Sequence, residues 1–383
     1  MTAPWALVPL GRCLCQVRES ITLADDQEYR QVTVLLHGRG VQLRQVVRGV
    51  DVKTKSQFVV RAGQLVCSRI DARNGALGLV PPGLEGAVVS SDFPTFAVDG
   101  DVAEPRFIEY ATRTAMFVEA CRAPSRGVTN RQRLKEGQLL AISIPLPPLS
   151  EQRRIVALLD QVAHRVEEAR RLSEEAASGR QTLLLRQVEE LGKGVPCLPL
   201  ASVAPIVRRA VDVEPETWYP ELGIRSFGKG TFHKAPILGA ELGGKRIFHI
   251  EPGDLLFSNV FAWEGAIAVV QPEDEGRYGS HRFMTCLVDR TQATPEFLCR
   301  YFLTDEGMAA IRAASPGAAG RNRTLGIGKL AAIPVPVPPV AAQRRFADLA
   351  DRVRDAEVAR RAAIEALDTL MPAALDRAFD GGM

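Results

Sequence analysis

One unusual stretch of sequence occurs twice in this chain of 383 residues. Residues 144–160 read IPLPPLSEQRRIVALLD, and residues 333–351 read IPVPVPPVAAQRRFADLAD. Each copy is a run of prolines, then Gln-Arg-Arg, then apolar residues at helical spacing. Duplicated text of this kind indicates a duplicated supersecondary unit. Any fold proposed for one copy must therefore also fit the other.

The repetition extends well beyond these two stretches. Gln152 corresponds to Gln343 at an offset of 191 residues, and Gly63 corresponds to Gly253 at an offset of 190. Further matches are RAGQLVCS (61–68) with EPGDLLFS (251–258), AEPRF (103–107) with ATPEF (293–297), and RLKEGQLLAISIP (133–145) with TLGIGKLAAIPVP (324–336). The sequence therefore predicts two tandem units, each a globular part followed by a helix.

The segment after each proline run has the apolar spacing of a long amphipathic helix. Ser150 is expected to cap the first helix, which should end near Gly192, and the second should end or kink near Pro372. The residues that we assign to helix pairing are Ile155, Leu159, Val162, Val166, Phe346, Leu349, Val353 and Leu367.

Two arrangements of these helices fit the pattern. They could pair as an antiparallel coiled coil, or each could pack only on its own globular part. Residues 150–192 and 340–380 each hold seven basic and eight acidic side chains. This balance is typical of solvated, salt-bridged helices rather than of helices that bind DNA. We favour the antiparallel pair. Because each helix holds one more acidic than basic side chain and the chain has a net charge of +3, the positive excess lies outside the helices.

The globular parts have the alternation and turn signals of strands. RIFHIEPGDLLFS and FVVRAGQLVCS each predict two strands around a tight turn, and a helix is expected over 105–113 and over 295–314. The predicted fold class is α+β, with two tandem β-rich domains separated by two long antiparallel helices and an internal pseudo-twofold repeat. The predicted boundaries are 1–144 and 193–333 for the β-rich domains, and 145–192 and 334–383 for the proline runs with their helices.

Several function classes receive no support from the composition. No run approaches the ~20 apolar residues that cross a bilayer, and the N-terminus lacks the pattern of a signal peptide. We therefore expect a cytoplasmic protein with reduced thiols. The seven cysteines and five histidines show no metal-ligand spacing. No metal site and no cofactor is predicted.

The paired helices, each introduced by prolines and Gln-Arg-Arg, carry a family resemblance. With GDLLFSN, WEGAIAVV and the LDRAFDGG ending, they resemble the DNA-specificity subunit of type I restriction–modification systems over essentially the whole chain. One departure is that Ala342 stands where the first copy has Glu151, so Glu151 is assigned no chemistry beyond favouring the helix start. A weaker second helix start could also indicate a degraded copy.

The resemblance implies a subunit without catalytic activity of its own. Each globular part would be a target-recognition domain that reads one half of a bipartite, asymmetric site on double-stranded DNA. The helices would set the distance between the half-sites and dock methyltransferase subunits, which methylate adenine at N6, and restriction subunits would join that core. The assembled complex would be a DNA methyltransferase and an ATP-dependent endonuclease.

Loops with basic, amide and aromatic side chains are the candidate DNA contacts, because basic groups bind phosphates and amides read base edges. For Trp263, burial in the core is an equally good interpretation. The candidates in the first unit are Arg39, Arg44, Lys53, Lys55, Arg69, Arg73, Asn74, Arg126 and Arg131. Those in the second unit are Arg225, Lys229, His233, Lys234, Asn259, Trp263, Tyr278, His281, Arg282, Arg321, Asn322 and Arg323.

Enzymatic alternatives have little support in the sequence. GAELGGKR (239–246) nearly matches a phosphate-binding loop, but Arg246 replaces the hydroxyl residue that would bind magnesium. No Asp/Asn-Pro-Pro-Tyr motif is present, so the chain should not itself methylate adenine. The main alternative is a coiled-coil scaffold that binds other proteins and no DNA. A methylation-only system is a second alternative.

Overall fold

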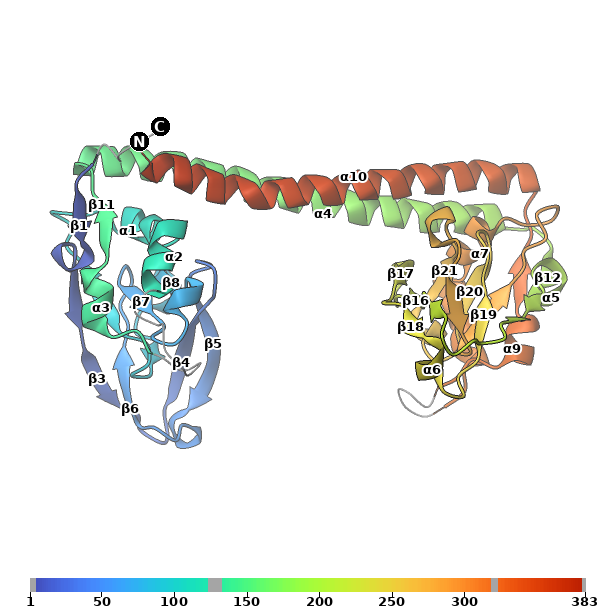
Figure 1. The fold of residues 1–383 in the computed structure, drawn as a ribbon, viewed down its shortest axis with the longest axis horizontal. Helices are drawn as coiled ribbons and strands as arrows, with labels where there is room; N and C mark the ends of the chain where they lie inside the picture. The colour runs from blue at the N-terminus through green and yellow to red at the C-terminus, as the bar shows by residue number, and fades with distance from the viewer. Residues whose placement is uncertain (1–4, 123–132, 318–322, 381–383) are drawn as a thin grey trace. The chain divides into compact units, whose positions relative to one another are not determined.

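The chain folds as two compact units (Figure 1). The computed structural model describes residues 5–122, 133–317 and 323–380. Unit 1 comprises residues 1–171 together with 362–383, and unit 2 comprises residues 172–361. The division falls inside both long helices, so each unit holds one globular part and a portion of each helix. The predicted α+β class with an internal repeat is confirmed.

Unit 1 is built from short strands, short helices and the first part of a long helix. Its strands are β1 (Leu7–Pro9), β2 (Leu14–Val17), β3 (Glu19–Thr22), β4 (Glu28–Val34), β5 (Val41–Arg48), β6 (Ser56–Val59), β7 (Leu65–Cys67), β8 (Leu77–Leu79), β9 (Val88–Val89), β10 (Thr95–Val98) and β11 (Ser143–Pro145). Its helices are α1 (Pro105–Ala111), α2 (Ala115–Arg122) and α3 (Glu136–Ala141), with 3-10 turns η1 (Leu10–Arg12), η2 (Gly49–Asp51), η3 (Ala72–Asn74) and η4 (Pro82–Leu84). The long helix α4 (Leu149–Gly192) continues into unit 2.

Unit 2 repeats this order of elements. Its strands are β12 (Cys197–Pro199), β13 (Ile206–Val207), β14 (Arg209–Ala210), β15 (Trp218–Tyr219), β16 (Leu222–Ile224), β17 (Thr231–His233), β18 (Ile237–Leu238), β19 (Ile247–His249), β20 (Leu255–Ser258), β21 (Ile267–Val269), β22 (Tyr278–Ser280), β23 (Phe283–Cys286) and β24 (Pro334–Pro336). Its helices are α5 (Leu200–Val203), α6 (Gly239–Leu242), α7 (Pro295–Tyr301), α8 (Asp305–Ala314) and α9 (Ile327–Ala331), with turns η6 (Ala262–Glu264) and η7 (Pro272–Asp274). The second long helix, α10 (Val340–Phe379), begins here and continues into unit 1.

The sheets of the two units follow the same plan. The sheet β2-β10-β7-β8 of unit 1 corresponds to β13-β23-β20-β21 of unit 2, and β1-β11 corresponds to β12-β24. Even the register agrees, because Thr95 faces Val17 and Thr285 faces Val207. The repeat found in the sequence is therefore a repeat of strand pairing.

One sheet is continuous in unit 1 and broken in unit 2. Unit 1 has the five-stranded sheet β3-β6-β9-β4-β5, whereas the corresponding segments of unit 2 form sheets of two or three short strands. Pro220 and Pro236 fall at the positions of Arg30 and Val46, which face each other as partners in the β4–β5 pair. Proline has no N–H to donate to a strand ladder, so these prolines divide the strands.

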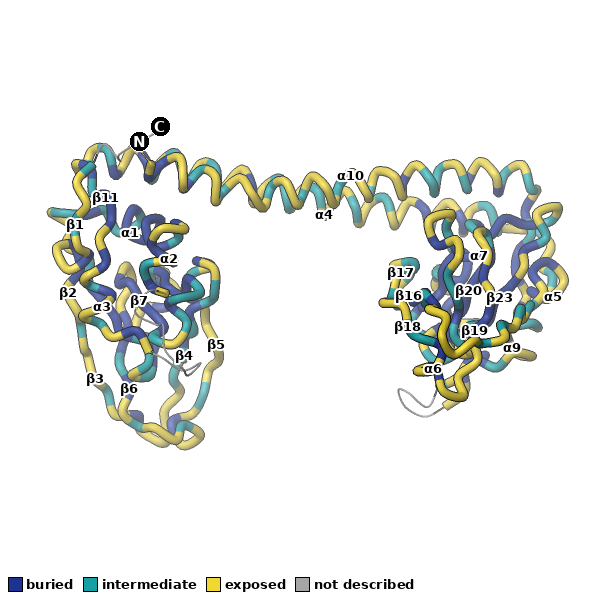
Figure 2. The backbone as a smooth tube through the Cα atoms, in the orientation of Figure 1, coloured by how far each residue is buried: buried dark blue, intermediate teal, exposed yellow. Residues whose placement is uncertain are grey.

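The cores lie inside the globular parts and extend to the long helices (Figure 2). In unit 1, Phe107 and Ile155 share a buried cluster with Leu375 and Phe379 near the end of α10. In unit 2, residues of both long helices, such as Leu184 and Phe346, join the core around Phe257. Burial of each such side chain contributes about 1.5–3 kcal/mol. Each helix therefore packs on the globular part as well as on the other helix.

Within each unit the two long helices run antiparallel. In unit 1, Ile155 lies in one cluster with Phe379, and further along α4 Arg170 pairs with Asp368. In unit 2, Arg360 donates to Ser173 at 3.5 Å, and Arg180 lies 3.9 Å from Glu357. Positions thus rise along α4 as they fall along α10, which confirms the predicted antiparallel direction.

Three expectations for the helices differ from the structure. Helix α10 does not end near Pro372 but continues to Phe379, because packing of Leu375, Ala378 and Phe379 into the core offsets the lost backbone hydrogen bond. Ser150 lies inside α4 rather than capping it. Residues 295–314 form two helices, because the first ends at Tyr301 and Thr304 caps the second by accepting from the N–H of Gly307.

A buried glutamine at the start of each long helix ties that helix to its globular part. Gln152 has no exposed surface. Its Oε1 accepts from the N–H of Glu104 at 2.8 Å, and its Nε2 donates to the carbonyls of Val102 at 3.1 Å and Pro147 at 2.8 Å. The side chain thereby satisfies one donor and two acceptors of the backbone that would otherwise be buried without partners.

The second copy repeats this hydrogen bonding at the equivalent backbone positions. Gln343 is also fully buried. It accepts from Thr294 N at 2.9 Å and donates to the carbonyls of Gln292 at 3.1 Å and Pro338 at 2.7 Å. The prolines before each helix have a matching role, since the carbonyls of Pro148 and Pro339 accept the first helical hydrogen bonds. This geometry explains why prolines followed by Gln recur in both copies.

We expect Gln152→Leu to lower the free energy of unfolding of unit 1 by about 2–4 kcal/mol, because it leaves three buried backbone groups without partners. The matched change Gln343→Leu should destabilise unit 2 similarly. Urea unfolding followed by circular dichroism measures both effects. Arg153→Gln, at an exposed neighbouring position, should change stability by less than about 0.5 kcal/mol. A change that small for Gln152→Leu would refute the structural role of the glutamine.

Candidate nucleic-acid interface

Each unit carries a β-hairpin whose tip has the same backbone structure. In unit 1 the tip is residues 35–40, between β4 and β5, and in unit 2 it is residues 225–230, between β16 and β17. The N–H of Leu35 donates to Gly40 O, and the N–H of Arg225 donates to Gly230 O, both at 2.9 Å. The sequences LLHGRG and RSFGKG thus form equivalent loops, each with one cation between two glycines.

In unit 2 this tip belongs to a group of cations stacked on aromatic rings, which we name the basic–aromatic cluster. The Arg225 guanidinium lies 4.9 Å from the Phe232 ring centre, and Lys229 Nζ lies 5.8 Å from that of Phe227. The Arg323 guanidinium lies 5.3 Å from the Trp263 ring centre. The members of the basic–aromatic cluster are Arg225, Phe227, Lys229, Phe232, Trp263 and Arg323.

Backbone hydrogen bonds hold the distant segments of this cluster together. The N–H of Phe227 donates to Glu264 O at 2.8 Å, which places the hairpin tip beside the turn that carries Trp263. Asn259 N–H donates to Arg282 O at 2.8 Å, and Asn259 O accepts from Leu325 N–H at 2.8 Å. Arg225, Lys229, Asn259, Trp263, Arg282 and Arg323 therefore gather in one region of unit 2. Trp263 is only half-buried and donates to Val260 O at 2.8 Å.

Other predicted contacts in unit 2 have partners inside the fold. His233 lies 3.0 Å from the buried carboxylate of Asp274, which also accepts from Thr231 at 2.9 Å. Tyr278 packs edge-on against Tyr219 at 5.2 Å between ring centres. Lys234 lies 4.0 Å from Glu221, and His281 is exposed. The proposal of DNA contact for His233 and Tyr278 is therefore weaker than that for the cluster.

The predicted contacts of unit 1 are more dispersed. Arg39 is exposed at the hairpin tip, Arg44 is exposed on β5, and Lys53 is exposed after η2. Lys55 is tied to Asp25 and to the carbonyl of Gly49. The carbonyl of Asn74 accepts from His37 N–H at 2.8 Å, so Asn74 and Arg73 lie beside the tip. Arg126, Arg131, Arg321 and Asn322 lie outside the described residues.

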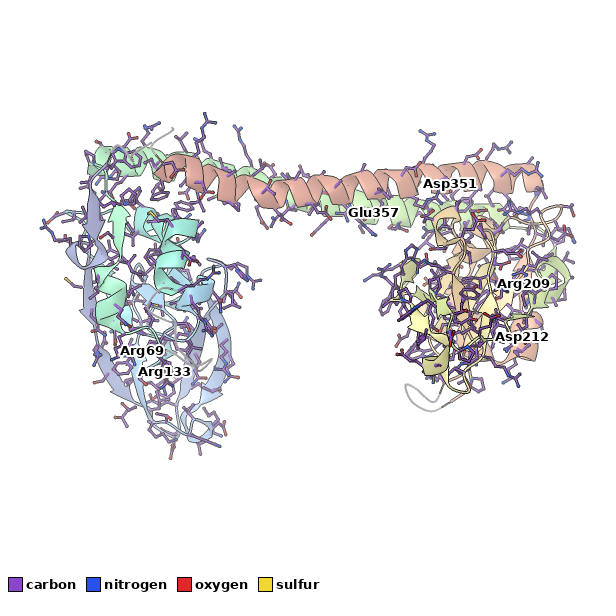
Figure 3. The ribbon with its side chains drawn as sticks, in the orientation of Figure 1. Arg69, Arg133, Arg209, Asp212, Asp351 and Glu357 are labelled. Carbon is purple, nitrogen blue, oxygen red and sulfur yellow. The ribbon has the colours of Figure 1, made fainter. Side chains whose placement is uncertain are left out.

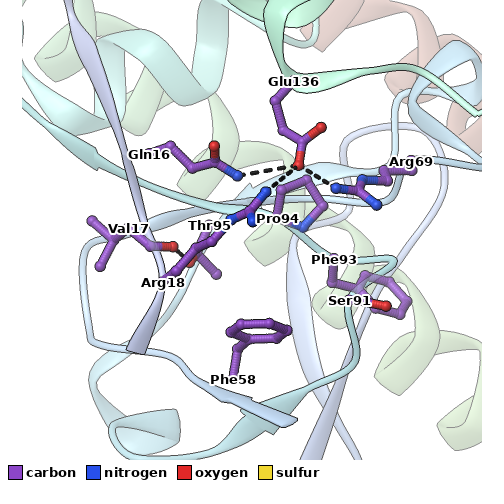
Figure 4. Close-up of a pocket in the computed structure, with 10 residues that line it drawn as sticks. All are labelled: Gln16, Val17, Arg18, Phe58, Arg69, Ser91, Phe93, Pro94, Thr95 and Glu136. Carbon is purple, nitrogen blue, oxygen red and sulfur yellow. Dashed lines mark hydrogen bonds and ion pairs between the residues drawn. The ribbon is translucent and has the colours of Figure 1, made fainter. Parts of the chain in front are cut away.

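Arg69 is held by a carboxylate in a pocket of about 200 Å³. Figure 4 shows Gln16, Arg18 and Arg69 converging on one oxygen of Glu136. The Gln16 and Arg18 nitrogens each lie 3.1 Å from that oxygen. Phe58 and Phe93 also line the pocket. Figure 3 labels Arg69 beside Arg133, whose neighbour Leu134 donates to Arg69 O at 2.9 Å.

The charge on Glu136 is stabilised by this arrangement. Burial alone would raise the pKa of Glu136, but hydrogen bonds from its own backbone N–H and from Arg69, together with the charge of Arg69, hold that pKa below its usual value. Sequence reasoning missed Gln16, Arg18 and Glu136, because no spacing in the sequence relates them. It also missed Phe227 and Phe232, although both lie within the RSFGKGTFHK segment that it favoured.

The predicted helix-pairing residues occupy two kinds of position. Ile155, Leu159, Phe346 and Val353 are buried where a long helix meets a globular core. Leu349 is half-buried against the core of unit 2. Val166 is buried, and Val162 and Leu367 are half-buried, further along the long helices. Among the described residues, no group of three or more His, Cys, Asp or Glu could hold a metal ion. No described helix is long and apolar enough to cross a membrane.

Comparison with known proteins confirms the family resemblance. Residues 85–175 match the family described as the Type I restriction modification DNA specificity domain. The chain is similar to the HsdS subunit from Thermoanaerobacter tengcongensis, with 22% identity, a TM-score of 0.56, and 99% of this chain and 97% of that chain covered. None of the curated proteins compared with this chain matches it.

A second solved structure supports the same fold. It is described as the structural basis of complex assembly and conformational transition of the type I R-M system, and the match has 21% identity and a TM-score of 0.68. The match covers 100% of both chains. Residues 85–175 thus match a type I specificity domain, and the whole chain shares the fold of the HsdS subunit and of the chain in the second structure.

The Glu136 site predicts a pH-dependent stability. Because the pKa of Glu136 is lowered in the folded chain, its contribution is present above the pKa of the unfolded chain and is lost as the pH falls through the folded value. Glu136→Gln should lower the free energy of unfolding by about 1–2 kcal/mol at pH 7. The difference from wild type should shrink below about pH 4.

Urea unfolding of wild type and Glu136→Gln at pH 7 and at a pH below about 4 measures the effect. Glu119→Gln is the control, because the pair that Glu119 forms with Arg122 at 3.3 Å is exposed on both sides and should contribute less than about 0.5 kcal/mol. An equal loss at both pH values for Glu136→Gln would show that the carboxylate charge has no part in the stabilisation.

Proposed function

We propose that this chain is the DNA-specificity subunit of a type I restriction–modification complex. In this proposal each globular part reads one half of a bipartite target on double-stranded DNA. The chain itself is non-catalytic and acts in the cytoplasm, where its DNA target lies. The match of residues 85–175 to a DNA specificity domain and the fold of the whole chain support this assignment.

The observation that carries the proposal is one backbone frame with different side chains in its two copies. Equivalent backbone hydrogen bonds close both hairpin tips and join them to the turns η3 in unit 1 and η6 in unit 2. At equivalent positions unit 1 has Arg69 and Arg73, whereas unit 2 has Asn259 and Trp263. A shared frame with changed surface groups suits two domains that bind the same polymer but read different bases. The target should therefore be asymmetric.

The long helices suit the remaining parts of this function. Helix α4 has 44 residues and α10 has 40, lengths of roughly 60–66 Å at about 1.5 Å per residue. We propose that they set the unread gap between the half-sites. Leu172, Leu183 and Val358 are exposed on the helices of unit 2, and Leu370 on those of unit 1. Such apolar surface suits docking of methyltransferase subunits, through which restriction subunits would join.

Adenine-methylation mapping tests the proposal in cells with and without this chain, with the methyltransferase partner present throughout. We expect a gapped, asymmetric motif that is methylated only when the chain is present. The control is a chain with Gln152→Leu and Gln343→Leu, which should fail to support methylation because both helix attachments are weakened. Unchanged methylation without the chain would contradict the proposal.

Salt dependence separates this function from a protein-binding scaffold. A DNA-reading subunit releases counterions on binding, so the logarithm of its affinity should fall linearly with the logarithm of salt concentration, with a slope of about −0.9 for each phosphate neutralised. Fluorescence anisotropy with a labelled duplex that carries the mapped motif gives this slope. A scaffold that binds only proteins would show no affinity for the duplex at any salt concentration.

A further inference from the structure

The two hairpin tips share a strained backbone position. Among the described residues, the non-glycine residues with positive φ are His37, at 58°, and Phe227, at 62°. They occupy equivalent places in the two units, each directly before a glycine that also has positive φ. A large side chain in this left-handed region is uncommon and costs roughly 1–3 kcal/mol. Its occurrence twice at one position of the repeat requires an explanation.

The surrounding structure fixes this backbone tightly. In unit 2, Phe227 N–H donates to Glu264 O at 2.8 Å, and Gly228 N–H donates to Gly265 O at 2.9 Å. A Cβ atom on Gly228 would lie 2.6 Å from the side chain of Leu303. In unit 1, a Cβ atom on Gly38 would lie 2.6 Å from the side chain of Arg113. Both loops are therefore anchored, and both require glycine at the position after the strained residue.

Packing does not account for the phenylalanine. Phe227 is 74% exposed, which is more than any other large apolar residue that the structure describes. Its ring gains little from burial, and glycine or asparagine would fit the same backbone at lower cost. The fold therefore bears both the strain and the exposure of an aromatic ring at this position.

The groups near Phe227 indicate what the ring binds. Lys229 lies over the ring, and Arg225 and Arg323 lie over neighbouring aromatic rings in the same cluster. The acidic Glu264 nearby accepts a hydrogen bond from Ser226 at 3.1 Å. An exposed ring beside cations matches a ligand with flat apolar faces and a negatively charged backbone, which is the chemistry of a nucleic acid.

We propose that Phe227 inserts against a base step in the half-site read by unit 2, while Lys229 binds an adjacent phosphate. His37 holds the equivalent place in unit 1, where its imidazole can also form hydrogen bonds with a base edge. This inference rests on the proposed function, because it needs a DNA target. It assigns the contact to one ring in each unit and explains why the strained position is kept in both copies.

Phe227→Gly separates a binding role from a structural one. Because glycine relieves the strain, we expect the melting temperature of the chain to rise or stay unchanged. Affinity for the mapped duplex, measured by anisotropy on the full chain assembled with its methyltransferase subunits, should fall roughly 10-fold, the effect of losing one base–aromatic contact. If Phe227 instead supports the fold, the melting temperature falls, and that result overturns the proposal.

A second comparison locates the contact. The same measurement uses two duplexes, each with one half-site scrambled. Phe227→Gly should weaken binding when the half-site of unit 2 is intact and should have less than about a 2-fold effect when that half-site is scrambled. Lys229→Gln is the matched control, because a phosphate contact should be lost equally on both duplexes. An equal loss for Phe227→Gly on both duplexes would overturn the base contact.

The outcome is distinguishable from failure of the proposed function. If wild-type protein shows no preference for any gapped motif, the specificity assignment has failed before Phe227 is tested. If wild type binds the motif and Phe227→Gly binds it equally well, the assignment stands and the inference about the ring is wrong. His37→Gly provides the corresponding test on the other half-site.

Discussion

The buried glutamine at the start of each long helix is the interaction on which the rest of the structure depends. Gln152 and Gln343 each connect three backbone groups from the helix start and from the loop before a short helix of the globular part. Because these groups are buried, a weaker partner would leave them unsatisfied at a cost of about 1–3 kcal/mol each. The direction of each helix relative to its own globular part is thereby fixed, and any function that uses the helices as a spacer requires this.

Divergence of the two copies has changed the surfaces and kept the frame. One ion pair shows this clearly, because Glu19 pairs with Arg61 in unit 1, and at the equivalent positions Arg209 pairs with Glu251 in unit 2. The charges are exchanged and the contact remains. At the hairpin tips the glycines and backbone hydrogen bonds are the same, while the neighbouring side chains differ. This pattern suits two domains with a shared way of binding and separate sequence preferences.

The repeat, the α+β class and the long helices could all be predicted from the sequence, because they depend on periodic apolar spacing and on duplicated text. The helix end beyond Pro372 could not, since it depends on tertiary packing of Leu375 and Phe379. The roles of the predicted site residues depend on partners distant in the sequence. Arg69 is bound by Glu136, His233 by Asp274, and only the structure shows Arg323 over Trp263. Phe227 was missed because composition does not reveal backbone strain.

The central claim is that two sequence-reading units are joined by helices that set their spacing. The most direct test inserts seven residues, one heptad, into both α4 and α10, after Arg171 and after Arg361, so that the apolar stripes keep their register. Methylation mapping then compares the gap in the target with that of the wild-type chain. An addition of about 10 Å to each helix should lengthen the gap by about three base pairs and leave both half-sites unchanged. Methylation at the original gap by the lengthened chain would contradict the account.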